Sequence, residues 1–367
     1  MRYRLLDLLA CPYDRHFPLE LAAETVIASP AAAASVRAKC ERWCALRHCA
    51  PAGADVSWPC DGCLESDIVD GTLRCSSCTR VFPIRAGIPR LLPDQLAHAG
   101  DDPPRDHDTR IKWQQQRQRD REAESFERLF LPYQTRLDAT TCLDALDLGA
   151  DDRLLDGGSG VGRLLRFAAG RCAEIVALDF SARSLQVLVS RSDIDPATPV
   201  HAILGDVEHL PLRDGVFDKV LSFGILEHLP SEASNRATLR EMHRVLRDRG
   251  LVALTAYNYA PLRRAMAPFS GAPHDRNGWH DEIFFHRFAT AELRALLAGV
   301  FSAFTITGLR HFPKQPASLL APIAEPLDRA LARTPFSRLA GYYLLARLAK
   351  ARGASVGMVA SGRSVHS

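Results

Sequence analysis

The chain has 367 residues, a formal net charge of +3, 47% hydrophobic and 24% charged residues. This length predicts two or three domains, and the hydrophobic content is sufficient for a complete core. No apolar run reaches the ~18 residues that span a bilayer. The near-neutral charge argues against a protein whose main partner is a nucleic acid.

The first residues, MRYRLLDLLAC, are similar to a lipoprotein signal because a small residue precedes Cys11, but Asp7 interrupts the short apolar stretch. Eight of the ten cysteines lie between Cys11 and Cys78. A secreted disulfide protein rarely concentrates its cysteines in front of a long cysteine-poor region, so the pattern favours metal-binding cysteines in a reducing compartment. We therefore expect a mature cytoplasmic protein.

The stretch CDGCLESDIVDGTLRCSSC contains two Cys-x2-Cys pairs, Cys60/Cys63 and Cys75/Cys78. Two thiolates from one tight turn can face the same metal. A hairpin that turns at the Asp-Gly of DIVDGTLR would bring the two pairs together as a tetrahedral zinc site. The alternative is four reduced cysteines in a small core, although so small a unit has little apolar surface to stabilise it.

The surrounding segments, LLDLLACPYD and CTRVFPIRAGIPRLLP, resemble the small zinc-ribbon domain that activates certain RNA and protein methyltransferases as a separate subunit and also occurs fused to methyltransferases. The usual first pair of that family is Cys-Pro-x-Cys, whereas Asp14 stands here in place of the second cysteine. The resemblance implies that Cys11 is a vestigial ligand and that Cys60 and Cys63 replace the pair. A second zinc site remains an open alternative for four thiols: Cys11, Cys40, Cys44 and Cys49.

Residues 1–95 are thus expected to form a cysteine-rich zinc-ribbon-like domain with an insertion. Residues 96–112 are polar and interrupted by prolines, which is typical of a linker. The charged run at 111–137 has few breakers and predicts a helix. Residues 113–352 are expected to form the second domain, and 353–367 a flexible tail.

From residue 150 onward, apolar β-rich runs alternate with helical stretches. This alternation predicts an α/β fold with a Rossmann-like, seven-stranded, mostly parallel sheet and helices on both faces. The expected strands are 153–156, 174–179, 200–206, 218–225, 251–258, 301–309 and 342–349.

The segment RLLDGGSGVGRLL places four glycines between the first of these strands and a helix, where ligands bind at the carboxyl edge of a sheet. The dinucleotide pattern G-x-G-x-x-G fails in both frames because Arg163 and Leu165 occupy its last position. The triphosphate loop would require a lysine that is absent here. Both phosphate-binding interpretations are therefore weak.

The remaining pattern, Asp156-x-Gly158-x-Gly160-x-Gly162, resembles the first motif of the class I S-adenosylmethionine-dependent methyltransferases of type 11. The resemblance continues in EIVALDFS, LGDVEHLPL and FDKVLSFGILEHL. It implies that Asp179 accepts the ribose hydroxyls, that Asp206 accepts from the adenine amino group, and that the Val207 amide meets a ring nitrogen. The implied residues for S-adenosyl-L-methionine are Asp156, Gly158, Gly160, Gly162, Asp179, Phe180, Asp206 and Val207.

Residues 258–288 form an insertion rich in histidine and aromatic residues, which we expect on the acceptor side of the pocket. His228, His280 and His286 are candidate general bases, since imidazole can take a proton from a hydroxyl. Methyl transfer can also proceed by alignment alone. Some ubiquinone-pathway O-methyltransferases carry a magnesium-binding acid where this chain has Gly224, which argues against a magnesium-assisted mechanism.

Residues 301–367 contain nine Lys or Arg residues against two acids. A segment at about 316–340 has helical apolar spacing and predicts a cap helix with a solvated basic face. Contact with an anionic membrane, a lipid-like acceptor or RNA are alternatives. The residues at helical spacing are Leu320, Ile323, Leu327 and Leu331.

Three functions remain as hypotheses. The first is methylation of a small or lipid-like biosynthetic intermediate, with oxygen as the favoured acceptor atom. The second is methylation of tRNA or rRNA held by the zinc ribbon and the basic tail. The third is a non-catalytic scaffold, against which the complete set of donor-site acids argues. The sequence predicts neither the acceptor nor the oligomeric state.

Overall fold

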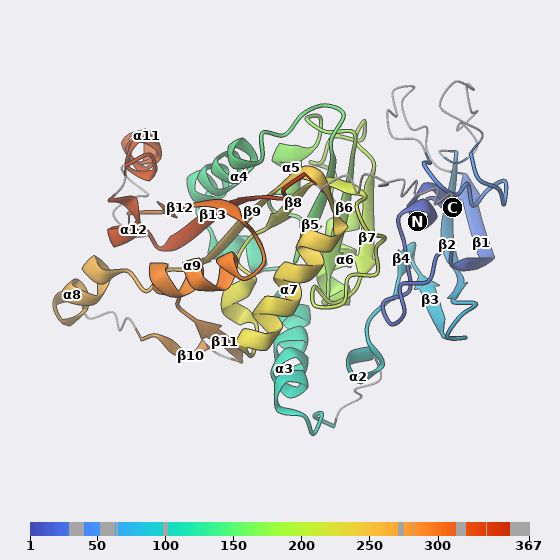
Figure 1. Cartoon of the computed structure of the whole chain (residues 1–367), viewed down its shortest axis with the longest axis horizontal. Coiled ribbons are helices and arrows are strands. Elements are labelled where there is room, and N and C mark those ends of the chain that lie inside the picture. The colour runs from blue at the N-terminus through green and yellow to red at the C-terminus, as the bar shows by residue number, and fades with distance from the viewer. Residues whose placement is uncertain are drawn as a thin grey trace, which may run out of the picture.

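The computed structural model describes residues 1–28, 40–51, 63, 65–97, 102–270, 275–280, 282–312, 321–334 and 336–352. Cys60 and the expected tail at 353–367 lie outside this set. Figure 1 shows a small sheet near the N-terminus beside a larger layered body in which helices cover a twisted sheet. Within the described residues, no helix is both long enough and apolar enough to cross a membrane.

The small sheet is antiparallel, in the order β1-β2-β3-β4. Its strands are β1 (Glu20–Ala28), β2 (Ser66–Arg74), β3 (Val81–Arg85) and β4 (Ile88–Pro89), and the short 3-10 helix η1 (Tyr3–Asp7) precedes them. The predicted hairpin turn in DIVDGTLR is wrong, because β2 continues through it. A Cβ on Gly71 would lie 2.5 Å from the Ala22 carbonyl oxygen, so this glycine allows β1 and β2 to approach closely.

The large sheet has seven strands in the order β12-β13-β9-β8-β5-β6-β7. Only β13 runs against its neighbours, and all seven predicted strands are confirmed. The strands are β5 (Arg153–Gly157), β6 (Glu174–Asp179), β7 (Val200–Leu204), β8 (Phe217–Ser222), β9 (Leu246–Tyr257), β12 (Ala303–Leu309) and β13 (Tyr343–Ala349).

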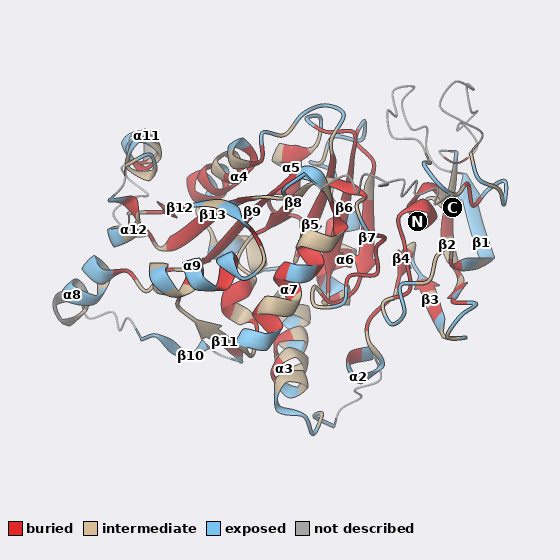
Figure 2. Ribbon diagram, in the orientation of Figure 1, coloured by how far each residue is buried: buried red, intermediate tan, exposed pale blue. Residues whose placement is uncertain are grey.

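Helices lie on both faces of this sheet, as predicted. Successive residues of a strand point to opposite faces, and Leu155 packs with α7 and α9 while Leu154 packs with α4, α5 and α6. Figure 2 shows the buried strands between these layers. The helices are α4 (Pro132–Leu146), α5 (Leu165–Ala168), α6 (Ala182–Val189), α7 (Glu232–Val245) and α9 (Thr290–Ala298).

The expected helix at 111–137 is broken, because α3 (His107–Glu122) ends before the short η2 (Phe126–Leu129) and α4 begins at Pro132. Proline fits the first helical turn because its missing N–H needs no partner there. The Asp106 carboxylate caps α3 by accepting from the Thr109 amide, so helix begins inside the expected linker. The other elements are α2 (Asp94–Ala97), η3 (Leu226–His228), α8 (Pro261–Ser270), β10 (Asn277–His280), β11 (Ile283–His286), α11 (Ala321–Ala332) and α12 (Ser337–Ala340).

Candidate functional site

The glycine loop follows β5 in a conformation that few other residues adopt. Gly158, Gly160 and Gly162 have φ values of +86°, +53° and +74°, in the region where L-residues are strained. A Cβ on Gly158 would lie 2.1 Å from the Cδ1 atom of Ile225, whereas a Cβ on Gly160 would have no neighbour within 4 Å. The loop therefore leaves open space beside Gly160 for a ligand to approach the backbone.

Asp179, the last residue of β6, fastens this loop. One carboxylate oxygen accepts from the Gly160 amide at 2.8 Å, and the other accepts from the Ser181 amide at 2.8 Å. Burial raises the pKa of Asp179. Each carboxylate oxygen has a further lone pair, so Asp179 can hold the loop and still accept hydroxyl donors.

Asp156, near the end of β5, is also buried. Burial and the charge of Asp179 raise the pKa of Asp156 to about 7, against the opposing effect of Arg163. Two acids therefore face a common low-dielectric region at the carboxyl edge of the sheet. Ligand groups that donate hydrogen bonds, rather than phosphates, suit such a site.

Helix α3 lies across this edge and contacts the predicted donor residues. Lys112 donates to Asp206 at 2.6 Å and is paired with Glu208 at 2.5 Å. Gln116 donates to the Phe180 carbonyl oxygen at 2.7 Å. An adenine amino group bound at Asp206 must therefore share this carboxylate with Lys112 or displace the lysine. Lys112 was not anticipated from the sequence.

The sequence also gave no role to Glu227, a fully buried residue of η3 at the end of β8. Neither of its carboxylate oxygens has a hydrogen-bond partner among the described residues. One of them would lie 3.5 Å from a Cβ on Gly224. Burial raises the pKa of Glu227 to about 8, although Arg119 acts in the opposite direction. An unpartnered buried carboxyl group is costly, and such groups are typical of ligand sites.

Aromatic rings surround this part of the site. Tyr257, the last residue of β9, has its ring centroid 5.6 Å from that of His228 and 5.3 Å from that of Tyr343. The ring of Phe223 lies 5.0 Å from Tyr343. The site thus combines acids on the donor side with an aromatic wall that a planar or apolar acceptor can contact.

The three predicted histidine bases differ in their surroundings. The Nδ1 atom of His228 donates to the Phe284 carbonyl oxygen at 2.7 Å, which leaves Nε2 as the unprotonated nitrogen. Burial and the Arg119 charge lower the pKa of His228 to about 3, so it is a weak base. His286 contacts Asn277 through one ring nitrogen and Glu292 through the other.

Both nitrogens of His286 are therefore engaged, and the ring fastens the β10–β11 hairpin to α9. This arrangement leaves no ring nitrogen for the proton of an acceptor. His280 is exposed on β10, and its role as a base remains a prediction.

In the N-terminal domain, four potential ligands converge whose ligand atoms all lie within 4.8 Å of one another: Cys11, Asp14, Cys75 and Cys78. The Cys11 and Cys78 sulfurs are 3.6 Å apart, and the Cys75 sulfur is 3.5 Å from an Asp14 oxygen. Cys11 and Asp14 therefore lie beside the pair formed by Cys75 and Cys78, a geometry that favours Cys11 as a potential ligand over the interpretation of Cys11 as vestigial.

Cys60 lies outside the described residues, so the predicted Cys60/Cys63 pair is not observed. Cys63 is buried. Within the part of the chain that the structure describes, Cys40, Cys44 and Cys49 join no group of three potential ligands. The alternative of a second zinc site therefore has no geometric support there.

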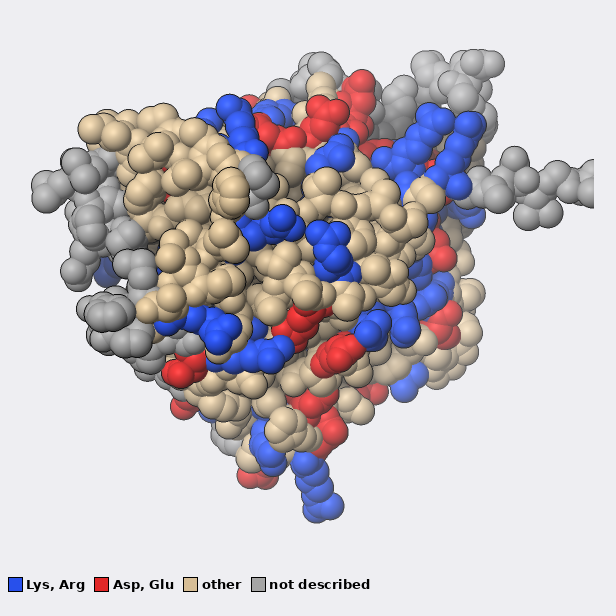
Figure 3. Space-filling view, turned by 60° about the vertical axis from the view of Figure 1, so that its left-hand side comes forward, with Lys and Arg blue, Asp and Glu red and all other residues tan. Residues whose placement is uncertain are grey.

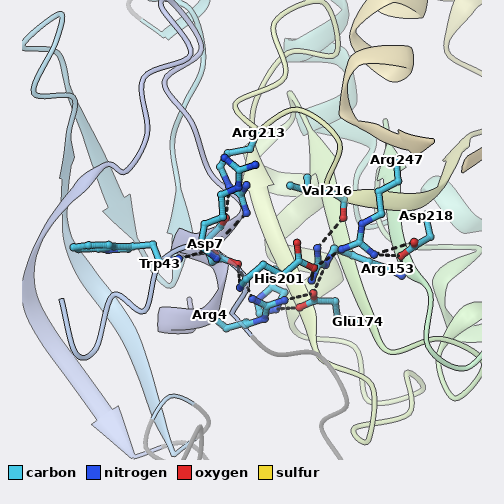
Figure 4. A network of polar contacts seen from close by, with 12 residues as sticks. Arg4, Asp7, Trp43, Arg153, Glu174, His201, Arg213, Val216, Asp218 and Arg247 are labelled. Atoms are coloured by element: carbon cyan, nitrogen blue, oxygen red, sulfur yellow. Dashed lines mark hydrogen bonds and ion pairs between the residues drawn. The ribbon is translucent and has the colours of Figure 1, made fainter. Parts of the chain in front are cut away.

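The N-terminal domain meets the amino ends of the large sheet through buried charges (Figure 4). Glu174, the first residue of β6, is paired with Arg4 at 2.9 Å and with Arg153. Asp7 accepts from Arg4 at 3.0 Å and lies 3.5 Å from Arg213. Both acids are fully buried, so the two parts of the chain share one ion-paired interface.

Comparison with known families assigns both parts. Residues 2–87 match the family of Trm112p-like proteins, and residues 155–254 match the methyltransferase domain family. A malonyl-[acyl-carrier protein] O-methyltransferase of Geobacter sulfurreducens is 35% identical over 150 residues, which are 40% of this chain and 54% of the relative. A demethylmenaquinone methyltransferase of Mycolicibacterium vanbaalenii is 35% identical over 116 residues, 31% of this chain and 46% of the relative.

The chain thus spans about half the length of these curated relatives. Among solved structures, the complex of the Haloferax volcanii Trm112 methyltransferase activator with a putative methyltransferase aligns at 19% identity and a TM-score of 0.42, covering 68% of this chain and 95% of that one. The two family matches show that the chain joins a Trm112p-like domain at residues 2–87 to a methyltransferase domain at residues 155–254.

Proposed function

We propose that the chain transfers a methyl group from S-adenosyl-L-methionine to a small or lipid-like biosynthetic intermediate, on oxygen. The observation that carries this proposal is the contact between Asp179 and the Gly160 amide, beside open space in a loop of positive-φ glycines. The residues fit the donor, since a nucleoside without phosphates requires hydrogen-bond acceptors and close backbone approach. The bound donor supplies an electrophilic methyl group on a sulfonium ion.

In this proposal Asp179 accepts from the ribose hydroxyls and Asp206 from the adenine amino group. The glycine loop supports the amino-acid portion of the donor, next to Asp156. These contacts align the acceptor oxygen with the methyl carbon, and alignment is the main source of rate in such transfers.

Glu227 takes the proton of the acceptor hydroxyl in this mechanism. It is buried, lacks a hydrogen-bond partner among the described residues and stands beside the aromatic wall of Tyr257. Its raised pKa of about 8 is better matched to proton transfer near neutral pH than that of His228. The transfer forms the bond between oxygen and the methyl carbon, breaks the carbon–sulfur bond, and moves the hydroxyl proton to the Glu227 carboxylate.

The acceptor class is supported by relatives whose names specify a malonyl-[acyl-carrier protein] and a demethylmenaquinone. Both names describe biosynthetic intermediates rather than RNA. The aromatic wall is consistent with an acceptor that has apolar surface.

The N-terminal cluster is proposed to hold a structural zinc ion. Three thiolates and one carboxylate form a ligand set that zinc accepts in tetrahedral geometry. The cluster joins the loop containing Cys11 to the turn between β2 and β3. Such a link would stabilise a domain with a small apolar core.

Titration calorimetry with S-adenosylmethionine tests the donor site. Changing Asp179→Ala removes two hydrogen-bond acceptors and should weaken donor binding about 10- to 100-fold. The matched control is Asp214→Ala, which removes an exposed carboxylate paired with Arg244. Equal donor affinity of the Asp179 variant and the parent protein would refute the pocket.

The acceptor is identified by supplying isotopically labelled donor to fractionated cell extract. Label in a small-molecule or lipid fraction supports the proposal. Label confined to tRNA or rRNA would contradict it and favour RNA methylation.

A further inference from the structure

Helix α11 turns large apolar side chains toward solvent and a charged side chain toward the protein body, the opposite of an ordinary surface helix. Ile323 and Leu327, one turn apart, are 64% and 46% exposed, whereas Ala324 and Asp328 are buried at 5% and 2%. A surface helix normally buries its apolar stripe. The expectation that the apolar stripe of a cap helix packs on the body is therefore not met for Ile323 and Leu327.

The polar residues of α11 are fixed to the protein body. The Asp328 carboxylate accepts from the His311 amide at 2.9 Å and is paired with the His311 ring at 2.7 Å. Glu325 is paired with Arg136 and Arg329. These contacts hold α11 in the orientation that turns Ile323 and Leu327 outward.

Exposed apolar side chains also lie on α12 and α8, at the same end of the molecule (Figure 1). We call this surface the apolar end patch, and it consists of Leu262, Ile323, Leu327, Phe336 and Leu339, which are 46–71% exposed. Arg263 of α8 donates to the Ala340 carbonyl oxygen at 2.7 Å, so α8 and α12 are joined. In Figure 1 the three helices form the end of the molecule opposite the N-terminal domain.

Basic side chains border this patch. Arg264, Arg333 and Arg338 have no acidic partner within the part of the chain that the structure describes. The two acids of α11 are already paired, so they do not neutralise these arginines. Figure 3, in which this end of the molecule comes forward, shows broad surfaces without acidic side chains next to Lys and Arg.

Strand register places the patch near the proposed active site. Leu309, at the end of β12, pairs with Tyr343, which in turn pairs with Tyr257 at the end of β9. The segment between β12 and β13, which contains α11 and α12, therefore leaves the sheet at the edge that carries Tyr257. The patch helices and the aromatic wall therefore follow strand ends at the same edge of the sheet.

We propose that the apolar end patch docks on an anionic lipid membrane. Outward apolar side chains ringed by arginines match the acyl boundary and anionic headgroups of a bilayer. A nucleic acid is disfavoured because its binding draws mainly on clustered positive charge, whereas this surface is mainly aliphatic. The inference rests on the proposed function to the extent that a membrane is the source of a lipid-like acceptor.

Co-sedimentation of the full chain with vesicles, in the absence of donor, tests the docking surface. Binding is expected to vesicles of phosphatidylcholine with phosphatidylglycerol, and to be much weaker for phosphatidylcholine alone. The double change Ile323→Asp and Leu327→Asp should reduce binding at least about tenfold, since it places charge in the apolar face. The change Arg333→Glu with Arg338→Glu should also reduce binding about tenfold or more.

The matched control is Val189→Asp on α6, at a site 52% exposed and outside the patch, which should leave vesicle binding unchanged. Absence of vesicle binding, or equal binding by the patch variants, would overturn the proposal. So would a dimer that dissociates in the Ile323/Leu327 variant, because the patch would then be an interface between two copies. All patch variants should keep parental donor affinity, so failure of docking is distinguishable from failure of the donor site.

Discussion

The buried acids at the two ends of the large sheet have pKa values that are shifted in opposite directions. At the amino ends, Glu174 is surrounded by arginines, and although burial alone would raise its pKa, Arg4 and His201 lower it well below its usual range. At the carboxyl ends, burial raises the pKa of Asp156 to about 7 and that of Glu227 to about 8. The amino ends thus contain permanently charged ion pairs, whereas the carboxyl ends contain acids whose protonation state can change near neutral pH.

This contrast indicates that the acids at one end of the sheet are structural and that those at the other end belong to the proposed ligand site. The amino-end acids join the N-terminal domain to the body and are neutralised by arginines of the protein itself. The carboxyl-end acids surround the glycine loop and the aromatic wall, where a ligand would satisfy them. Burial alone therefore does not indicate function, whereas a buried acid with no cationic partner is a candidate functional group.

The largest expected effect concerns the amino end. Changing Glu174→Gln leaves Arg4 and Arg153 as buried cations without their shared carboxylate. Removing one partner of a buried pair costs ~3–5 kcal/mol, so the urea midpoint should fall sharply. The exposed control Glu232→Gln, which removes a surface pair with Arg236, should change stability by less than about 1 kcal/mol. Similar midpoints for both variants would contradict the architectural role.

The next effect concerns the carboxyl end. Changing Glu227→Gln removes the proposed proton acceptor while keeping the shape of the side chain. The kcat should fall at least ~100-fold, while the donor affinity measured by calorimetry stays near the parental value. The parental rate should rise with pH through about 8, the pKa of Glu227, and this rise should be absent in the variant. An unchanged kcat would show that alignment alone suffices.

Glu227 should also give stability a pH dependence of known sign. Its pKa is 4.5 when unperturbed and about 8 in the fold, so the folded state holds a proton that the unfolded state has lost. The contribution is complete below about pH 4.5 and disappears as pH rises through 8. Between pH 6 and 9 the parent should lose about 2.7 kcal/mol more stability than the Glu227→Gln variant. If the urea midpoints of the parent and the variant change by the same amount between pH 6 and pH 9, the raised pKa of Glu227 is excluded.

The sequence predicted well those features that are local in the chain. The seven strands, the glycine loop and the position of Asp179 follow from periodicity and from a strand–loop–helix motif within a short segment. Gly71 was misread as a turn residue because its role depends on β1, which approaches from a distant part of the chain.

The unpredicted features depend on tertiary packing. Glu227 is distinctive only because no partner reaches it in the fold, and Asp14 because it converges with Cys75 and Cys78. The outward face of Ile323 and Leu327 could not be inferred, since helical spacing identifies a stripe but not the side on which it packs. The Glu-His pair at the end of FDKVLSFGILEHL was the one sequence signal that could have drawn attention to Glu227.

The smallest expected effect concerns Asp206. This acid lies at the carboxyl ends of the strands but, unlike Glu227, has a cationic partner. Burial alone would lower the pKa of Lys112, but Asp206 and Glu208 raise it, so the lysine stays charged and holds α3 over the predicted adenine site. Changing Lys112→Met removes the cation from a largely buried ion pair, and donor affinity should rise a few-fold because the adenine amino group no longer competes with the lysine for Asp206. A loss of affinity would instead show that Lys112 positions the carboxylate for the donor, and that α3 belongs to the binding site rather than covering it.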